Sequence, residues 1–104
     1  MREELDGIVE KYNLIERTFT SFWQAYDAYL EEEPTESREA GLCNRDSISA
    51  ELYGYAFCVT KQLDFDCITV TIEFGLKEKH FRCGEYWCEY SLDGKEFDYY
   101  FVID

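Results

Sequence analysis

The stretch WCEYSLDGKEFDYY, residues 87–100, predicts a β-hairpin and sets the fold around it. Aromatic and acidic residues alternate on both sides of Asp93 and Gly94. Asp-Gly is typical of a two-residue type I′ turn, which needs positive φ at both central positions. A turn there gives an inner, apolar face with the pairs Leu92–Lys95, Tyr90–Phe97, Cys88–Tyr99 and Tyr86–Phe101. The outer face then carries the pairs Ser91–Glu96, Glu89–Asp98, Trp87–Tyr100 and Glu85–Val102.

The sequence before this hairpin supplies further strands. Residues 48–60 are rich in Tyr, Phe and Val, and residues 65–74 alternate apolar with polar side chains, which is typical of a strand with one buried face. With the hairpin arms at about 79–90 and 96–103, four strands are predicted. The links at 61–64, 75–78 and 93–94 are short, so successive strands are expected to be antiparallel neighbours in a meander.

The third strand changes the phase of its alternation. Phe81 and Cys83 are odd-numbered, whereas Tyr86, Cys88 and Tyr90 are even-numbered, and Gly84 lies between the two sets. A β-bulge at Gly84 keeps all five side chains on one face. The alternative is a turn at 83–85 that splits the strand in two.

The first third of the chain predicts one long helix over about 2–33. Apolar residues recur every three or four positions from Leu5 to Leu30, the spacing of an amphipathic helix. A bend or break is expected near RTFTS, residues 17–21, where Ser21 with Gln24 resembles a capping box. Tyr and Phe on the stripe favour packing against a sheet over a coiled coil. Pro34 ends the helix, and 34–47 is predicted to be an exposed, polar connection.

These elements predict one α+β domain over 1–104, a long N-terminal helix packed on a four-stranded antiparallel meander. With 10 Lys+Arg against 23 Asp+Glu, the chain has a formal charge of −13, which repels nucleic acid and anionic membranes and attracts basic partners. No apolar run is long enough for a membrane span. Five cysteines and an N-terminus without the features of a signal peptide favour a reducing cytoplasm, that of the host if the source is a virus.

The chemistry-bearing residues do not form a familiar catalytic or metal-binding pattern. Cys83 and Cys88 with His80 lack the usual spacing of structural zinc ligands, so inward-facing core thiols are the preferred interpretation. Cys43, with Arg45 nearby, is the strongest candidate for a reactive thiol. His80 lies in a short basic run, and no glycine-rich phosphate loop is present. We therefore expect no enzyme activity, no cofactor and no metal.

The outer face of the hairpin is the predicted interaction surface. Trp87 and Tyr100 lie where the helix cannot cover them, beside the like-charge pair Glu89 and Asp98, an arrangement that is unfavourable within a sheet. Aromatic anchors supply contact energy, and acids attract and orient a basic partner. The alternative is that residues 34–47 or a second copy of the chain covers this face. The predicted partner-binding residues are Glu85, Trp87, Glu89, Glu96, Asp98 and Tyr100, followed by Asp6, Glu10, Asp27 and Glu31 on the acidic helix face.

The resulting hypothesis is a small acidic, non-enzymatic inhibitor of a basic, nucleic-acid-binding protein. A phage antagonist of a nuclease or CRISPR effector, mimicking the charge of nucleic acid, is one version. An immunity protein that neutralises a toxin is another. A self-associating structural domain, such as a homodimer, is the alternative from a different class. Direct binding of nucleic acid or membrane is not expected.

Overall fold

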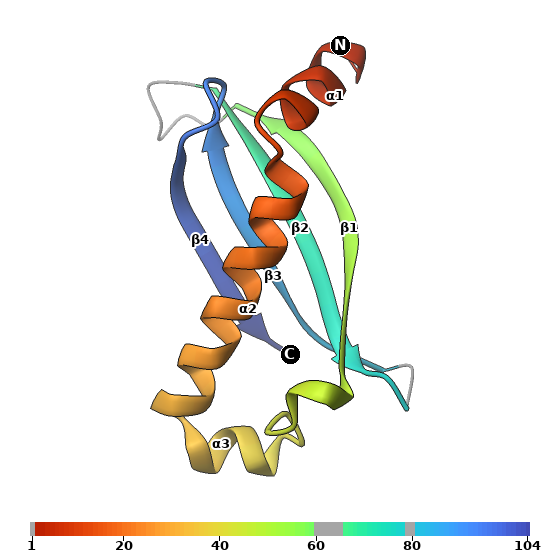
Figure 1. Ribbon diagram of the computed structural model, residues 1–104, viewed down its shortest axis with the longest axis vertical. Helices are drawn as coiled ribbons and strands as arrows, with labels where there is room; N and C mark the ends of the chain where they lie inside the picture. Colours follow the sequence, from red (N-terminus) through yellow and green to blue (C-terminus); the bar gives the residue numbers. More distant parts are fainter. Residues whose placement is uncertain (1, 60–65, 79–80) are drawn as a thin grey trace.

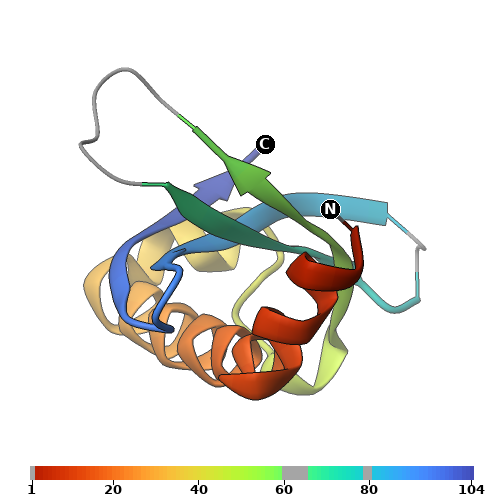
Figure 2. The same cartoon turned by 90° about the horizontal axis from the view of Figure 1, so that it is seen from above.

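The computed structural model describes residues 2–59, 66–78 and 81–104. Helices lie on one face of a single antiparallel sheet, whose strands follow the sequence in the order β1-β2-β3-β4 (Figures 1 and 2). The predicted α+β architecture with a four-stranded meander is confirmed. The elements are α1 (Arg2–Lys11), α2 (Leu14–Glu32), α3 (Pro34–Glu39), a 3₁₀ turn (Arg45–Ser47), β1 (Ile48–Cys58), β2 (Cys67–Leu76), β3 (Phe81–Ser91) and β4 (Glu96–Ile103).

The N-terminal helix is split, but not where the sequence predicted. The break lies at Asn13, whose φ of 55° is left-handed and separates α1 from α2. Asparagine tolerates this conformation better than most residues. Ser21, the predicted cap, instead lies inside α2, and its hydroxyl pairs with that of Tyr86 on the sheet. Packing on the sheet therefore overrides the weak helix propensity of residues 17–21.

The core forms between α2 and the inner face of the sheet. The ring of Phe22 lies 5.1 Å from that of Phe74 and 5.7 Å from that of Tyr86. Burying such aromatic side chains contributes about 1.5–3 kcal/mol each. The other large, fully buried side chains of this cluster come from both layers: Val9, Leu14, Tyr26, Leu42, Ile68, Val70, Ile72 and Tyr90.

The connection 34–47 is more ordered than predicted and stays on the helical side. Pro34 begins α3, since proline suits the first turn of a helix. Leu42 is buried, and its carbonyl accepts a hydrogen bond from the Tyr26 hydroxyl on α2. Arg45 forms an ion pair with Asp27 at 3.2 Å. Most residues of 34–47 are exposed, as predicted, but Ser37 and Leu42 are buried. The contacts of Leu42 and Arg45 place the connection away from the outer sheet face.

The β3–β4 turn differs from the predicted type I′ turn. Gly94 alone has positive φ there, at 84°, and the Ser91 N–H donates to the Lys95 carbonyl at 2.9 Å. The loop therefore contains three residues, 92–94, and the register near it moves by one. The ladder slips back at Phe97, where Tyr90 pairs with Glu96 but Glu89 pairs with Asp98.

This slip separates the predicted pairs into two groups. From Glu89 and Asp98 to Glu85 and Val102 the predicted register is confirmed. The pairs Leu92–Lys95, Tyr90–Phe97 and Ser91–Glu96 are wrong. Phe97 and Tyr99 were expected in the core but are 37% and 59% exposed on β4, the edge strand. On this strand, α2 packs instead against Phe101.

The bulge predicted at Gly84 is confirmed. Phe74 pairs with Gly84 and Gly75 with Arg82, so Cys83 is the extra residue on β3. A side chain at Gly84 would collide with the Val102 carbonyl and lie 2.8 Å from the Phe74 ring. The bulge thus keeps Cys83 buried with the side chains that follow it, Tyr86, Cys88 and Tyr90. Predicted strand ends at residues 60, 65 and 79–80 and the link 61–64 fall outside the described residues.

Candidate functional site

The outer face of the sheet carries the predicted aromatic pair. Trp87 on β3 and Tyr100 on β4 are directly opposite each other, and their rings stack with centroids 5.0 Å apart. Tyr100 is 40% exposed, and the helices lie on the other side of the sheet (Figure 2). The sequence prediction that the helix leaves this pair uncovered is therefore confirmed.

Next to this pair, the two acids Glu89 and Asp98 occupy opposite positions, as predicted. Asp98 Oδ2 accepts a hydrogen bond from the Tyr100 hydroxyl at 2.8 Å, and its Oδ1 accepts one from the Tyr99 N–H at 2.9 Å. These bonds direct the carboxylate along the edge strand. The hydrogen bond to Asp98 raises the pKa of Tyr100 to about 12, because an ionised phenol would lie beside a carboxylate.

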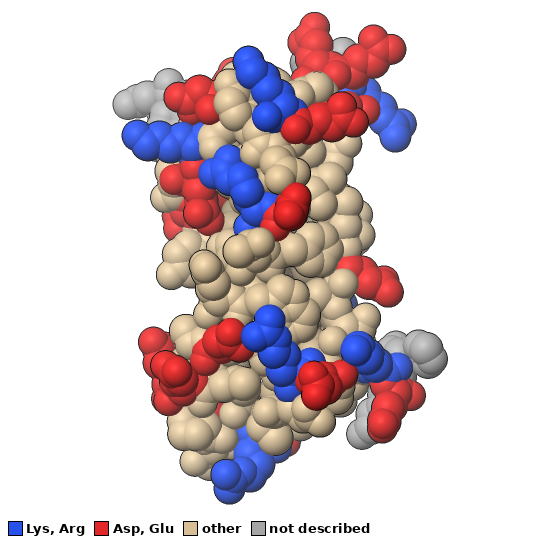
Figure 3. Space-filling model, viewed as in Figure 1, with Lys and Arg blue, Asp and Glu red and all other residues tan. Residues whose placement is uncertain are grey.

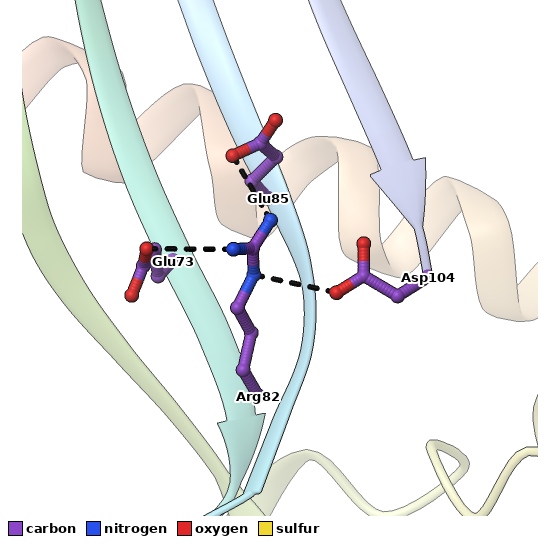
Figure 4. Close-up of polar contacts among 4 residues, drawn as sticks. All are labelled: Glu73, Arg82, Glu85 and Asp104. Atoms are coloured by element: carbon purple, nitrogen blue, oxygen red, sulfur yellow. Dashed lines mark hydrogen bonds and ion pairs between the residues drawn. The ribbon is translucent and has the colours of Figure 1, made fainter.

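A second group of acids surrounds Arg82 at the other end of the outer face. Its guanidinium pairs with Glu85 at 3.1 Å, Asp104 at 3.3 Å and Glu73 at 3.7 Å (Figure 4). Glu51 on β1 continues the row, since it pairs with Glu73 in the β1–β2 ladder. The guanidinium fixes three carboxylates in place but neutralises a single charge, so the cluster keeps a net negative charge.

A shallow hollow lies between these two groups. It has a volume of about 330 Å³, with Thr69 and Thr71 of β2 between Tyr53 on one side and Trp87 on the other. Glu73, Glu85 and Arg82 complete its lining. Tyr53 is 72% exposed and lies at the β1 bulge, where two residues oppose one on β2. Aromatic walls with carboxylates at one end suit the alkyl stem and charge of a lysine or arginine side chain.

Glu96 does not belong to this face, which corrects the predicted site. It pairs with Tyr90, whose side chain points into the core, and its carboxylate lies 3.5 Å from the Ser21 hydroxyl on α2. The three-residue turn is the cause, because it reverses the side on which residue 96 lies. Glu96 lines a polar recess of about 280 Å³ between α2 and the hairpin.

The acidic residues predicted on the helices do not form one surface. Asp6 accepts a hydrogen bond from Tyr55 of β1, and Asp27 pairs with Arg45. Glu10 and Glu31 are exposed but lie on α1 and at the far end of α2. On the helical face, acids and bases alternate near both ends and the middle is largely uncharged (Figure 3). We therefore assign the site to the outer face of the sheet.

Sequence reasoning missed five contributors to the outer face: Glu51, Tyr53, Glu73, Arg82 and Asp104. The predicted alternation of residues 65–74 put Glu73 on the polar face of its strand, but Glu73 was not included among the predicted binding residues. Arg82 was assigned to a basic run, and its carboxylate partners come from β2, β3 and the C-terminus, which only the folded chain brings together.

Three of the five cysteines are buried inside the protein. Cys67, Cys83 and Cys88 are buried, and Cys43 is exposed. Cys58 and Cys67 are opposite each other in the β1–β2 ladder, and burial together with the neighbouring Cys58 thiol raises the pKa of Cys67 to about 11. Within 2–59, 66–78 and 81–104, no three His, Cys, Asp or Glu side chains are grouped as metal ligands. His80 lies outside the described residues, and the reactivity of Cys43 stays a prediction.

Comparison with known proteins adds no relative. No family model matches the chain, and no curated protein or solved structure shows significant similarity to it. None of the helices in the described part of the chain has the length and apolar character needed to cross a membrane.

Proposed function

We propose that the protein binds a basic protein through the outer face of its sheet and thereby inhibits it. The observation that supports this most directly is the stacked Trp87–Tyr100 pair between two groups of carboxylates, in which Tyr100 is exposed and Trp87 half-buried. Tryptophan and tyrosine are frequent energetic anchors of protein interfaces. The partner is expected to be a nucleic-acid-binding protein, because such proteins present the cationic surfaces that a strongly acidic chain complements.

The charge distribution supports a positively charged partner over a neutral one. The outer face carries Glu51, Glu73, Glu85 and Asp104 near Arg82, and Glu89 and Asp98 beside the aromatic pair. Acids in this density, on a chain of formal charge −13, accelerate encounter with a cationic surface and repel nucleic acid. A protein of this kind blocks a nuclease or CRISPR effector by occupying its nucleic-acid site. The five cysteines, three of them buried, are compatible with the reducing cytoplasm in which such an encounter takes place.

The test begins with capture of partners from host lysate by the immobilised protein and continues with the purified candidate. We expect Trp87→Ala and Tyr100→Ala each to weaken binding at least about tenfold, as truncation of an interface anchor does. Phe57→Ala is the matched control, because Phe57 is a similarly exposed aromatic, at 37%, on the opposite edge strand. Binding should also fall steeply between low and high salt.

Either of two results would count against the proposal. If both outer-face variants bind every purified partner as tightly as wild type does, this surface is not the interface. If the complex is insensitive to salt, charge mimicry is not the mechanism. If the captured partner is a toxin, the protein is an immunity protein and not an inhibitor of a host effector. The binding surface would be the same in both cases.

Self-association is the second candidate, and one observation favours it. The large apolar side chains that remain most exposed lie on β1 or directly after it, in the β3–β4 turn or on β4: Leu52, Tyr53, Phe57, Val59, Leu92, Phe97, Tyr99, Tyr100 and Val102. Sedimentation equilibrium distinguishes the two functions, because finding a monomer at micromolar concentration would exclude the homodimer.

A further inference from the structure

The free edge of β4 has a defined set of backbone groups. The Asp104 N–H donates to the Cys83 carbonyl at 2.8 Å, and the ladder continues in register from Gly84–Ile103 to Glu89–Asp98. Backbone groups alternate in direction along an antiparallel strand. Val102 and Tyr100 therefore bond to β3, whereas the N–H and C=O groups of Tyr99, Phe101 and Ile103 point away from the sheet.

A side chain already occupies one of these outward positions. Asp98 Oδ1 accepts the Tyr99 N–H at 2.9 Å. The carboxylate oxygen thus takes the place that a carbonyl of an added strand would have. β4 is the last strand of the sheet, and α2 crosses its helical face near Phe101 (Figure 1).

The side chains around this edge suit an added strand on both faces of the sheet. Tyr100 and Val102, each 40% exposed, extend on the outer side, and Tyr99, 59% exposed, extends on the helical side. In strand addition, main-chain hydrogen bonds supply affinity, and contacts with alternate side chains supply specificity. A segment paired with β4 would cover all three.

The negative charge around β4 favours a basic segment over a second copy of the chain. Asp98 and Asp104 lie on or directly after β4, and Glu89 lies beside Asp98 on β3. A second copy of the chain brings its own acids and a formal charge of −13 to the same place, which opposes pairing between copies. A lysine- or arginine-rich segment is attracted instead.

We propose that β4 accepts an extended basic segment of a partner protein as a fifth strand of the sheet. The inference rests on the proposed function for the basic character of the partner, and it adds the docking mode. The incoming backbone pairs with Phe101 and Ile103, displaces the Asp98 carboxylate from the Tyr99 N–H, and places its cations beside Glu89 and Asp98.

Two peptides of equal charge test this docking mode on the intact protein. The probe is acetyl-Lys-Val-Lys-Val-Lys-Val-amide, and the control is acetyl-Lys-Pro-Lys-Pro-Lys-Pro-amide, whose prolines lack backbone N–H groups. We expect the valine peptide to bind about tenfold more tightly than the proline peptide, because the proline peptide loses main-chain hydrogen bonds. It should also slow hydrogen exchange at the Phe101 and Ile103 amides.

A pair of variants isolates the backbone of the edge. Tyr99→Pro removes an outward N–H and leaves the ladder to β3 intact, whereas Tyr99→Ala removes the same side chain and keeps the N–H. We expect the valine peptide to bind Tyr99→Pro about tenfold more weakly than Tyr99→Ala. If Tyr99→Pro misfolds, which circular dichroism reports, the two peptides on the wild-type protein still decide the question.

The outcomes separate this inference from the proposed function. Equal binding of both peptides, with shifts of the Trp87 indole N–H but unchanged exchange at residues 101 and 103, overturns strand addition and leaves the basic-partner surface in place. Binding of neither peptide at low salt overturns both. The free protein could also dimerise through β4, in which case hydrogen exchange at residues 101 and 103 becomes slower as the protein concentration rises. That result identifies a second copy as the occupant of the edge and also overturns the inference.

Discussion

The Asp98 carboxylate lies 2.8 Å from the Tyr100 hydroxyl, two residues along the same edge strand, and accepts its hydrogen bond. This contact explains how an acid is tolerated opposite Glu89. The Tyr99 N–H and the Tyr100 hydroxyl both donate to Asp98, so part of its charge is satisfied within the strand. By accepting the Tyr99 N–H, Asp98 also occupies a backbone donor at the free edge of the sheet, where open N–H groups can pair with the strands of other chains.

The Asp98–Tyr100 contact gives a prediction in the alkaline range. In Asp98→Ala, we expect the pKa of Tyr100 to fall from about 12 towards its ordinary value of about 10. In the wild-type protein, the folded-state pKa is the higher one. The contact therefore stabilises the fold below about pH 10, and its contribution is lost as the pH rises towards 12.

Titration of the Tyr100 ring carbon by NMR measures this pKa directly. Glu89→Ala is the control, because Glu89 raises the pKa of Tyr100 less than Asp98 does. An equal fall in both variants would show that general negative charge, and not the hydrogen bond, sets the pKa.

Arg82 offers a prediction that separates an electrostatic from a structural role. Arg82→Gln removes the cation from the acidic cluster, and we expect faster, tighter binding of a basic partner or peptide at low salt. The loss of stability should stay below about 1 kcal/mol, because these ion pairs are largely solvent-exposed. Surface plasmon resonance measures the first effect and urea denaturation the second. Weaker binding would mean that Arg82 itself contacts the partner.

The bulge at Gly84 gives a matched pair of glycine variants. Gly84→Ala places a methyl group against the Val102 carbonyl and the Phe74 ring, and we expect it to destabilise the fold by about 3 kcal/mol or more. A side chain at Gly54 meets no atom within 4 Å, so Gly54→Ala should change stability by less than about 1 kcal/mol. Urea denaturation monitored by circular dichroism compares them. Similar stability of the two variants would contradict the close approach at the bulge.

The left-handed residue between α1 and α2 predicts the effect of two substitutions. Asn13→Ala should cost about 1 kcal/mol or more, since alanine disfavours a φ of 55° and loses the 2.8 Å hydrogen bond to Glu16. Asn13→Gly loses the same bond but adopts positive φ freely, so it should be the more stable of the two. Thermal unfolding of both variants decides this. A more stable alanine variant would indicate one continuous helix through residue 13.

Local patterning gave the register of most of the hairpin but not its turn. The pairs from Glu89–Asp98 to Glu85–Val102 were predicted from a two-residue turn at Asp93-Gly94. They are correct because the slip at Phe97 compensates for the third residue of the turn. Asp93-Gly94 fits more than one turn type. The turn that forms leaves only Gly94 with positive φ, and the 2.7 Å hydrogen bond from Arg17 of α2 to the Gly94 carbonyl is a tertiary contact. The error at Glu96 follows from that choice.

The sequence by itself determined the layers, the strand order and the aromatic pair on the outer face, because periodicity and short links are local properties of the chain. Only the tertiary structure decided that Arg82 gathers Glu73, Glu85 and Asp104, and that the helix breaks at Asn13. The physical reason is the same in both cases. Ion pairs between strands and the path of a helix over a sheet depend on distances between segments that are remote in sequence.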